Sequence, residues 1–579
     1  MEPRASLDAP GGAPDGQLIS PVLLALLLFP QGSSTVSQAI PSSTDGLDEV
    51  RQLYDAGRWN DVVQTVPESP DTAADLQFYR GLALAQMSRW AEAKNTLEAG
   101  LLRQPRDTRF LVELAGIAYR EKRFVKATRY LRRSLAIDGA DDYANNFLAS
   151  IYFLQDNLEA ALKYWNRVNK PKLSDLVFDP PSKLSPVLLD RTFAFSRGAA
   201  WTRNQFLTTE ALLESLDIFP GSRFDLGAQP DGSFDLKFHG SERNEWGTTK
   251  WASLLSLLRG LPYQSVYPEF YDLGAKGLNW RSMVRWDDEK RRISTEITGP
   301  LGENPAMRYS VHLQGLNENW NLTNTIAPAT LAGVNLEKVT ADAGIQDIVS
   351  GRWQWSAAAQ YSYRKLRNPL GIPTKAAPFF TDSSAIAVQP KIQRSIVRFP
   401  ERRFTVDSGV TGEIGTFFSR PLGRYARIQA SLQGNWLPKS RGEDFETHFS
   451  LCGGSTFGSV PFDELFILGF DRDNDLWMRG HPGLRDGEKG NAPLGRSYAI
   501  ENAEMDKIAY KGALFIVKAG PFLDSGDVYD PSGYFGSARW LWDTGIQAKF
   551  RVLSSIELVL GYGKDLRSGR NSFFTTVSR

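Results

Sequence analysis

From about residue 245 onward, the chain is a series of short segments in which apolar and polar side chains alternate. In 425–434, for example, Ile428 and Leu432 fall on one side of an extended chain, while Arg427 and Gln433 fall on the other. Successive side chains of a strand point to opposite faces, so each segment is predicted to be a strand with one apolar and one polar face. The same alternation recurs at 307–314, 353–363 and 546–552.

A soluble β-sandwich also alternates, so the pattern alone does not decide the fold. The number of segments, the alternation of long and short connections and the lack of a second apolar face favour a transmembrane antiparallel β-barrel over 245–579. At about twenty residues per strand and turn, this length predicts roughly 16 strands. Aromatic residues stand where an interfacial girdle would use them: Trp280, Trp286, Trp353, Trp540 and Trp542.

Residues 44–170 have helical periodicity and a repeat of 34 residues. The small residues Ala93, Ala127 and Ala161 form one column of the repeat, Gly81, Ala115 and Ala149 form a second, and the bulky Leu97, Leu131 and Trp165 form a third. Small residues belong where two helices approach closely, and the period and pattern resemble those of tetratricopeptide (TPR) repeats. The resemblance implies an α-solenoid that binds peptides or proteins; a generic helical bundle is the alternative.

A short αβ segment at 187–244 follows a proline-rich linker at 170–186. We expect a strand at 192–196, a helix at 203–216 and a hairpin formed by 223–226 and 234–238. Asp231-Gly232 supplies the turn of that hairpin. The segment resembles a POTRA module, which implies that it passes substrates to the barrel by adding a strand to its sheet edge. An unrelated αβ spacer is the alternative.

Two motifs near the end of the chain resemble those of one superfamily. Leu476-Trp477-Met478-Arg479-Gly480 resembles the Arg-Gly loop, and Phe522-Leu523-Asp524-Ser525-Gly526 resembles the Phe-x-Asp-x-Gly strand, of the BamA/TamA/two-partner-secretion barrels, which include the bacterial surface antigens. Glu504 falls at the acid of the intervening strand, although the Arg-Phe-Pro that often follows is absent, and His481 replaces the usual aromatic residue after the glycine.

The resemblance implies that the loop folds back into the barrel and is anchored there. A guanidinium can form bidentate bonds to a carboxylate in a partly dehydrated space, so Arg479 and Asp524 are the predicted anchor. Gly480 would let the loop backbone approach closely, and Gly526 would relieve crowding where the loop docks. The alternative is that both side chains are solvated and do not meet.

The N-terminal segment is expected to be a signal peptide over residues 1–39. The apolar run 18–29 is too short to span a bilayer, which takes roughly twenty residues, and the small-x-small pattern Ser37-Gln38-Ala39 suits cleavage. Acidic residues before the run make its first part atypical. Export would place the helical and POTRA-like parts in the bacterial periplasm and the barrel in the outer membrane.

No catalytic, metal or nucleic-acid function is predicted. The chain has 67 Lys and Arg against 66 Asp and Glu, so its net charge gives no case for a nucleic-acid partner. The single cysteine, Cys452, excludes an intramolecular disulfide. Asp471, Asp473 and Asp475 imitate a calcium loop, but Leu476 stands where glycine is required. The histidines are scattered and no nucleophile or phosphate-loop motif occurs, so we expect no enzyme and no cofactor.

These patterns predict a multidomain α + β protein that assembles or translocates outer-membrane or secreted proteins. Client or partner proteins would bind the TPR and POTRA-like parts, and lipid would surround the barrel. The alternative is a passive pore or surface-antigen barrel whose helical half docks periplasmic partners. An assembly role needs poorly paired first and last strands, whereas a passive pore needs a fully paired barrel. A soluble TPR and β-sandwich protein is a third possibility, which the loop motif disfavours.

Overall fold

The computed structural model describes residues 44–69, 71–323, 330–372, 374–512, 515–552 and 556–578. The expected signal peptide at 1–39 lies outside these residues. The chain divides into two compact units, Met1–Leu154 and Gln155–Arg579. No helix in the described ranges is long and apolar enough to cross a lipid bilayer.

The first unit consists of helices whose starts repeat along the chain. α4, α6 and α8 begin 34 residues apart, as do α5 and α7. Small residues lie at close contacts: a Cβ on Gly81 would stand 2.6 Å from Leu97, and Ala93, Ala115 and Ala127 are fully buried, as is Ala149. The helices are α2 (Thr44–Asp55), α3 (Trp59–Thr65), α4 (Ala74–Gln86), α5 (Trp90–Arg103), α6 (Thr108–Arg120), α7 (Phe124–Ile137) and α8 (Asp142–Leu154).

The second unit begins with the helix α9 (Leu158–Trp165), which contains the buried Ala161 and is bound to the sheet that follows. Glu159 accepts hydrogen bonds from Arg203, in α11, and from Arg398, in β11. Asn157 donates a hydrogen bond of 2.8 Å to the carbonyl of Pro400. The last helix of the 34-residue pattern is therefore fixed to the barrel unit.

A small αβ module follows. It contains β1 (Leu173–Asp179), α10 (Pro186–Thr192), α11 (Arg203–Leu216), β2 (Arg223–Ala228) and β3 (Phe234–His239), with the sheet order β1-β3-β2. The helix and the hairpin lie where they were predicted. The expected strand at 192–196 is wrong, because α10 ends at Thr192 and Phe193 packs into the core.

The third strand of the module is β1, which lies within the expected linker. Its prolines stand at its ends, Pro171 before it and Pro180 after it, where no ladder hydrogen bond is lost. The module therefore begins earlier than the predicted residue 187.

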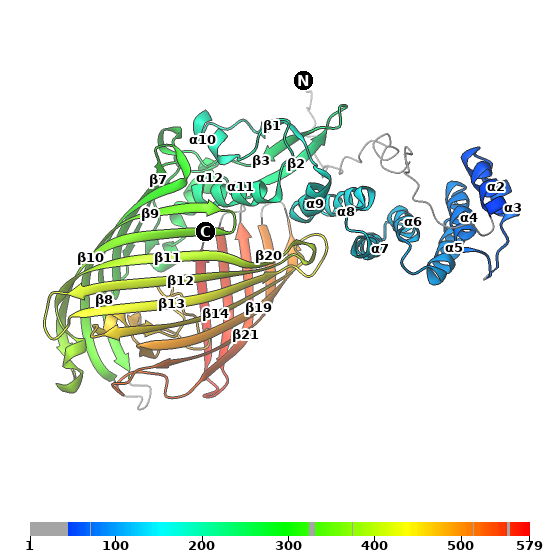
Figure 1. The fold of residues 1–579 in the computed structure, drawn as a ribbon. Helices are drawn as coiled ribbons and strands as arrows, with labels where there is room; N and C mark the ends of the chain where they lie inside the picture. Colours follow the sequence, from blue (N-terminus) through cyan, green and yellow to red (C-terminus); the bar gives the residue numbers. More distant parts are fainter. Residues whose placement is uncertain are drawn as a thin grey trace, which may run out of the picture. The chain divides into compact units, whose positions relative to one another are not determined.

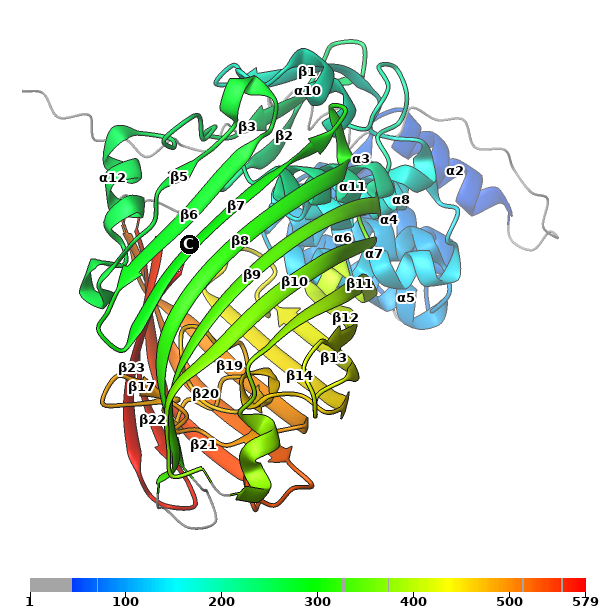
Figure 2. The ribbon, with the colours of Figure 1, turned by 90° about the vertical axis from the view of Figure 1, so that its left-hand side faces the viewer.

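The rest of the chain forms a large antiparallel sheet that is rolled into a barrel (Figure 1). Its strand order contains 18 strands, of which 14 have eight or more residues in the described ranges. Figure 2 shows β6 to β14 running side by side. These long strands are β6 (Asn279–Trp286), β7 (Lys290–Leu301), β8 (Asn304–Thr323), β9 (Thr330–Ser350), β10 (Trp353–Leu370), β11 (Ser383–Phe399), β12 (Phe404–Phe417), β13 (Arg424–Trp436), β14 (Phe445–Gly458), β19 (Ser497–Lys511), β20 (Phe515–Tyr529), β21 (Leu541–Val552), β22 (Ile556–Asp565) and β23 (Asn571–Ser578).

The barrel differs from the prediction at its beginning. Residues expected to start the first strand form the helix α12 (Lys250–Leu258) and the turn η2 (Leu261–Tyr263). Trp251, Leu254, Leu255 and Leu258 recur at helical spacing rather than at every second position, which accounts for the helix. The predicted number of about 16 strands lies between the 14 long strands and the 18 of the full order.

The two faces of the barrel sheet are the reverse of those in a water-soluble protein. Ile293, Ile414 and Ile546 are each more than 60% exposed on the outside, whereas Arg364 and Asp524 are buried on the inside. Buried charges need partners, and long arrays of exposed apolar side chains are rare on soluble proteins. The wide apolar surface continues with Val311, Leu313, Val339, Ile345, Val388, Ile392, Val410, Ile428, Leu432, Leu451, Phe457 and Leu560.

The first and last strands of the barrel meet at a place we call the seam, where the first strand is short and broken. The first strand consists of two short pieces, β4 (Ser265–Val266) and β5 (Glu269–Phe270), which both pair with β6. The last strand, β23, is the neighbour of β4 on the other side. Neighbouring strands from β6 to β23 have registers of facing residues, whereas β23 closes the ring against β4, which is only two residues long. A hydrogen bond of 2.7 Å between the Tyr263 and Thr575 hydroxyls connects the two sides.

Candidate functional site: a loop anchored inside the barrel

The connection between β14 and β19, residues 459–496, folds into the barrel; we call it the lumen loop. It contains η6 (Phe462–Glu464), β15 (Phe466–Ile467), β16 (Leu484–Arg485), β17 (Glu488–Lys489) and β18 (Leu494–Gly495). Leu468 and Met478 are fully buried against side chains of β19 and β20, and Lys489 is paired with Trp320 of β8. The loop therefore contacts strands on different sides of the barrel.

Arg479 and Asp524 meet inside the barrel. The Arg479 Nη2 atom lies 2.6 Å from Oδ1 of Asp524, and Nε lies 2.9 Å from Oδ2. The backbone N–H of Arg479 also donates to Oδ2, at 2.9 Å. The two side chains are 4% and 0% exposed. This is a bidentate pair almost without contact with solvent, with the loop backbone bonded to the same carboxylate.

Other side chains complete the surroundings of Arg479. Its Nη1 atom donates to Glu504 at 2.6 Å and to Gln547 at 2.9 Å, and its guanidinium lies 3.9 Å from the ring centroid of Phe522. Glu504 is in turn paired with Lys549 at 2.5 Å. Each carboxylate near Arg479 thus has a second donor, so the site is a network rather than one ion pair.

Glycines allow the loop to reach the strands. A Cβ on Gly480 would stand 2.6 Å from the carboxyl carbon of Asp543 and 2.8 Å from the backbone nitrogen of Asp565. A Cβ on Gly563, in β22, would stand 2.4 Å from the carbonyl oxygen of Arg479. A Cβ on Gly526, in β20, would stand 2.9 Å from the carbonyl oxygen of Ala499 and 3.1 Å from the side chain of the loop residue Leu468.

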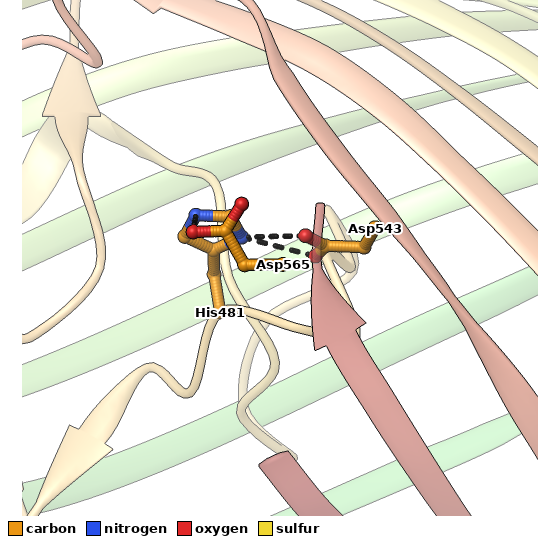
Figure 3. A group of neighbouring side chains, drawn as sticks. All are labelled: His481, Asp543 and Asp565. Atoms are coloured by element: carbon orange, nitrogen blue, oxygen red, sulfur yellow. Dashed lines mark hydrogen bonds and ion pairs between the residues drawn. The ribbon is translucent and has the colours of Figure 1, made fainter. Parts of the chain in front are cut away.

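His481 lies between two buried carboxylates (Figure 3). Its Nδ1 atom is 2.9 Å from Asp543, and its Nε2 atom is 3.5 Å from Asp565. Burial would lower the pKa of His481, but the hydrogen bond and the charges of the two aspartates outweigh it and raise the pKa. Because each ring nitrogen faces a different carboxylate, the arrangement suits an imidazolium that donates to both.

The same three side chains are the described residues that could hold a metal ion, since one ligand atom from each lies within 4.8 Å of the others. A nitrogen and two carboxylate oxygens are ligands that zinc accepts.

Two further anchors hold the lumen loop on other walls of the barrel. Asp473 accepts hydrogen bonds from Arg285 at 2.7 Å and from Arg292 at 3.1 Å, and Asp471 pairs with Lys290 at 3.2 Å. These cations belong to β6 and β7. Burial alone would raise the pKa of Asp473, but attraction to the neighbouring cations holds it far below its usual range.

The third anchor is in η6. Glu464 lies 2.7 Å from Arg364 in β10 and 2.8 Å from Lys338 in β9. Burial would raise the pKa of Glu464, and the attraction of these cations and of Arg427 lowers it well below the ordinary value. The lumen loop is thus held to β6 and β7, to β9 and β10, and to β20.

The structure brings Arg479, Gly480, Glu504 and Asp524 together. Gly526 does not contact Arg479 and packs instead against the loop residue Leu468. Sequence reasoning missed Asp543, Asp565 and the cations that bind Asp471 and Asp473. The alternation in 546–552 already placed Gln547 and Lys549 on the polar face. That alternation could have identified Gln547 and Lys549 as lumen residues. Asp543 could have been identified in the same way, because it lies four residues before Gln547 and so on the same face of the strand.

No family model and no curated protein matches the chain. Solved structures similar to it include BamA from Haemophilus ducreyi lacking POTRA domains 1–3, at 11% identity over 70% of this chain and 84% of that one, with a TM-score of 0.44. CdiB from Escherichia coli matches at 11% identity over 71% and 75% of the two chains, with a TM-score of 0.46. CdiB from Acinetobacter baumannii matches at 12% identity over 79% and 85%, with a TM-score of 0.41.

Proposed function

We propose that this protein is an outer-membrane barrel that inserts or translocates polypeptides. The membrane location is supported by the reversed faces of the sheet: apolar side chains such as Ile414 and Ile546 are exposed outside, and charged side chains such as Arg364 are buried inside. In a bilayer the outer face would be in contact with lipid chains, and a rolled sheet can satisfy its backbone internally.

The orientation follows from the turns that the N-terminal modules bind. Arg191 of α10 donates to the carbonyls of Gly302 and Glu303, in the β7–β8 turn. Thr208 of α11 accepts a hydrogen bond from the backbone of Gly351, in the β9–β10 turn. Both turns are two residues long, and the longest connections, 371–382, 459–496 and 530–540, lie at the other strand ends. Barrels of the outer membrane have short periplasmic turns, so the αβ module and α9 would lie in the periplasm.

The seam is the observation that carries the transport role. A passive pore is stable only if its strands pair all the way round, because an unpaired backbone in lipid costs several kcal/mol per group. Here β23 closes the ring against β4, which has only two residues, and the Tyr263 and Thr575 hydroxyls form a hydrogen bond across the same junction. Such a junction is the weakest part of the sheet and the place where a polypeptide strand could enter.

The helical unit and the αβ module would gather clients. Helical pairs that repeat every 34 residues form stacks that bind peptides or proteins in other settings. The sheet edge of the αβ module offers strand addition as a second mode of binding. A passive barrel with a docking scaffold is the alternative, and it would keep these binding roles without any opening of the seam.

The test is a seam that is locked chemically. Tyr263→Cys and Thr575→Cys, in a Cys452→Ser background, would be joined by a bifunctional thiol reagent. The protein would then be reconstituted in liposomes and supplied with an unfolded eight-stranded barrel protein. We expect the unlocked protein to accelerate folding of that client into the membrane, and the locked protein to lose the acceleration.

A matched control locks strands that are already paired. Ser431 faces Cys452 across β13 and β14, so Ser431→Cys can be joined to the native Cys452. This lock should leave the rate unchanged. Equal rates for the open and the locked seam would contradict insertion at the seam. Ion conductance without any acceleration of insertion would favour the passive pore.

A further inference from the structure

A cavity of about 530 Å³ lies where the αβ module meets the inner wall of the barrel. One side of it is formed by the end of α11, at Ser215 and Asp217, and the other by β6 to β10. Its volume is within the range of small-molecule and peptide side-chain sites, which is roughly 300–1,000 Å³. The lumen loop does not line it, so it is separate from the Arg479 network.

Three arginines line this cavity, and two of them have acidic partners. Arg243 pairs with Asp217 at 2.9 Å. Arg281 pairs with Asp217 at 3.2 Å and with Glu296 at 2.9 Å. These pairs use Asp217 and Glu296, whose side chains are 33% and 35% exposed; the remaining acid of the wall, Glu214, is exposed.

Arg308 is the third arginine and has no ion pair among the described residues. It is 5% exposed, its Nη1 atom has no hydrogen-bond partner there, and its Nη2 atom is 3.5 Å from the Thr298 hydroxyl. The residues that face it on the neighbouring strands are Pro300 and Gln346, neither of which carries a charge. A buried cation without a partner is costly, so this position calls for an anion.

The rest of the wall is suited to an anion of single charge. Ser310 and Ser356 add hydroxyl groups, and Gly344 and Ala357 keep that side of the cavity small and open. Arg243 and Arg281 are already paired with Asp217 and Glu296, so the charge left without an ion pair among the described lining residues is the single positive charge of Arg308. A carboxylate carries one charge and matches the two parallel N–H groups of a guanidinium.

We propose that this cavity binds a carboxylate group through Arg308. The group could belong to a small free acid or to an acidic side chain of a polypeptide at the barrel mouth. The binding chemistry is the same in both cases, and it does not depend on whether the seam opens.

The experiment uses the purified full chain in detergent, with thermal unfolding measured at constant ionic strength. Acetate should raise the unfolding midpoint of the wild-type protein, and acetamide, which has the same shape without the charge, should not. Arg308→Met should weaken acetate binding by roughly ten- to hundredfold, the range for a lost hydrogen bond to a charged group. Arg308→Lys, which keeps the charge, should retain part of the effect.

Arg367→Met is the matched control, because Arg367 also lies on the barrel sheet but is half exposed and outside the cavity. It should bind acetate like the wild type. A short peptide with one glutamate distinguishes the two sources of the carboxylate. If the peptide binds more tightly than acetate, and replacing the glutamate by glutamine abolishes the binding, the ligand is a polypeptide. If the peptide binds no more tightly than acetate, the ligand is a small acid.

Two results would overturn the proposal. One is stabilisation by acetate that Arg308→Met leaves intact, or that acetamide reproduces. The other is acetate binding by Arg308→Lys that is as tight as that of Arg367→Met, and this comparison decides the question even if Arg308→Met does not fold.

Discussion

Removing Arg479 should release the lumen loop from the wall formed by β19 to β21. In Arg479→Ala, the carboxylate of Asp524 keeps Asn502 and the loop backbone as donors but loses the guanidinium. Breaking a buried pair by removal of one partner costs about 3–5 kcal/mol, and the 4% and 0% exposure of these side chains puts the pair near full burial. Asp524→Ala should cost less, because Arg479 keeps its bonds to Glu504 and Gln547.

The double variant measures the interaction itself. Residues that share one buried interaction typically couple by about 0.5–3 kcal/mol, so Arg479→Ala with Asp524→Ala should be milder than the sum of the single changes. Chemical unfolding in detergent gives the free energies, and hydrogen exchange of the lumen loop reports its release. Arg485→Ala is the control in the same loop, because the Arg485 side chain is 64% exposed. Additive single effects, or unchanged exchange of the loop in Arg479→Ala, would refute the anchor.

Three further predictions concern other parts of the molecule. The protein should fractionate with outer membranes and migrate differently on gels before and after boiling; recovery in a soluble fraction would contradict the barrel assignment. Burial raises the pKa of Asp272 to about 6. Ionisation of Asp272 therefore lowers the stability of the folded protein as the pH rises from roughly 4 through 6. Asp272→Asn should raise the thermal unfolding midpoint at pH 8 but not at pH 4. Deletion of residues 44–154 should leave the barrel folded but abolish partner capture. Deletion of residues 44–170 should also destabilise the barrel, because it removes the hydrogen bonds of Glu159 to Arg203 and Arg398. Equal unfolding midpoints for the two deletion variants would contradict this expectation.

Sequence patterns predicted those helices, strands and turns that are determined by residues close together in the chain. Alternation located parts of four long strands, β8, β10, β13 and β21, because a strand with one apolar and one polar face must alternate. The 34-residue spacing located the helices, and the Asp231-Gly232 turn located the hairpin of the αβ module. β1 was missed because its flanking prolines resemble a linker, and α12 was missed because its helical spacing stands inside a region of strands.

The contacts inside the barrel could be predicted only where a motif names both partners. Arg479 and Asp524 belong to two motifs of one superfamily, so their meeting could be proposed. The partners of Asp473 lie more than 180 residues earlier in the chain, in β6 and β7, and nothing local marks them. Asp471 and Asp473 were therefore considered only as a calcium loop, whereas they are acceptors for buried cations of the barrel wall.

The pairing of the strands has a consequence for what the seam can accept. From the broken strand β4 and β5 through β6 to β23, each strand runs opposite to its neighbour. The broken strand and the 14 long strands make an odd number, so the two strands at the seam run in the same direction. One added strand would run antiparallel to both of them and complete an even ring, whereas an added hairpin would leave one parallel junction. If the seam admits a polypeptide as proposed, the parity of this barrel favours the entry of single strands, one at a time.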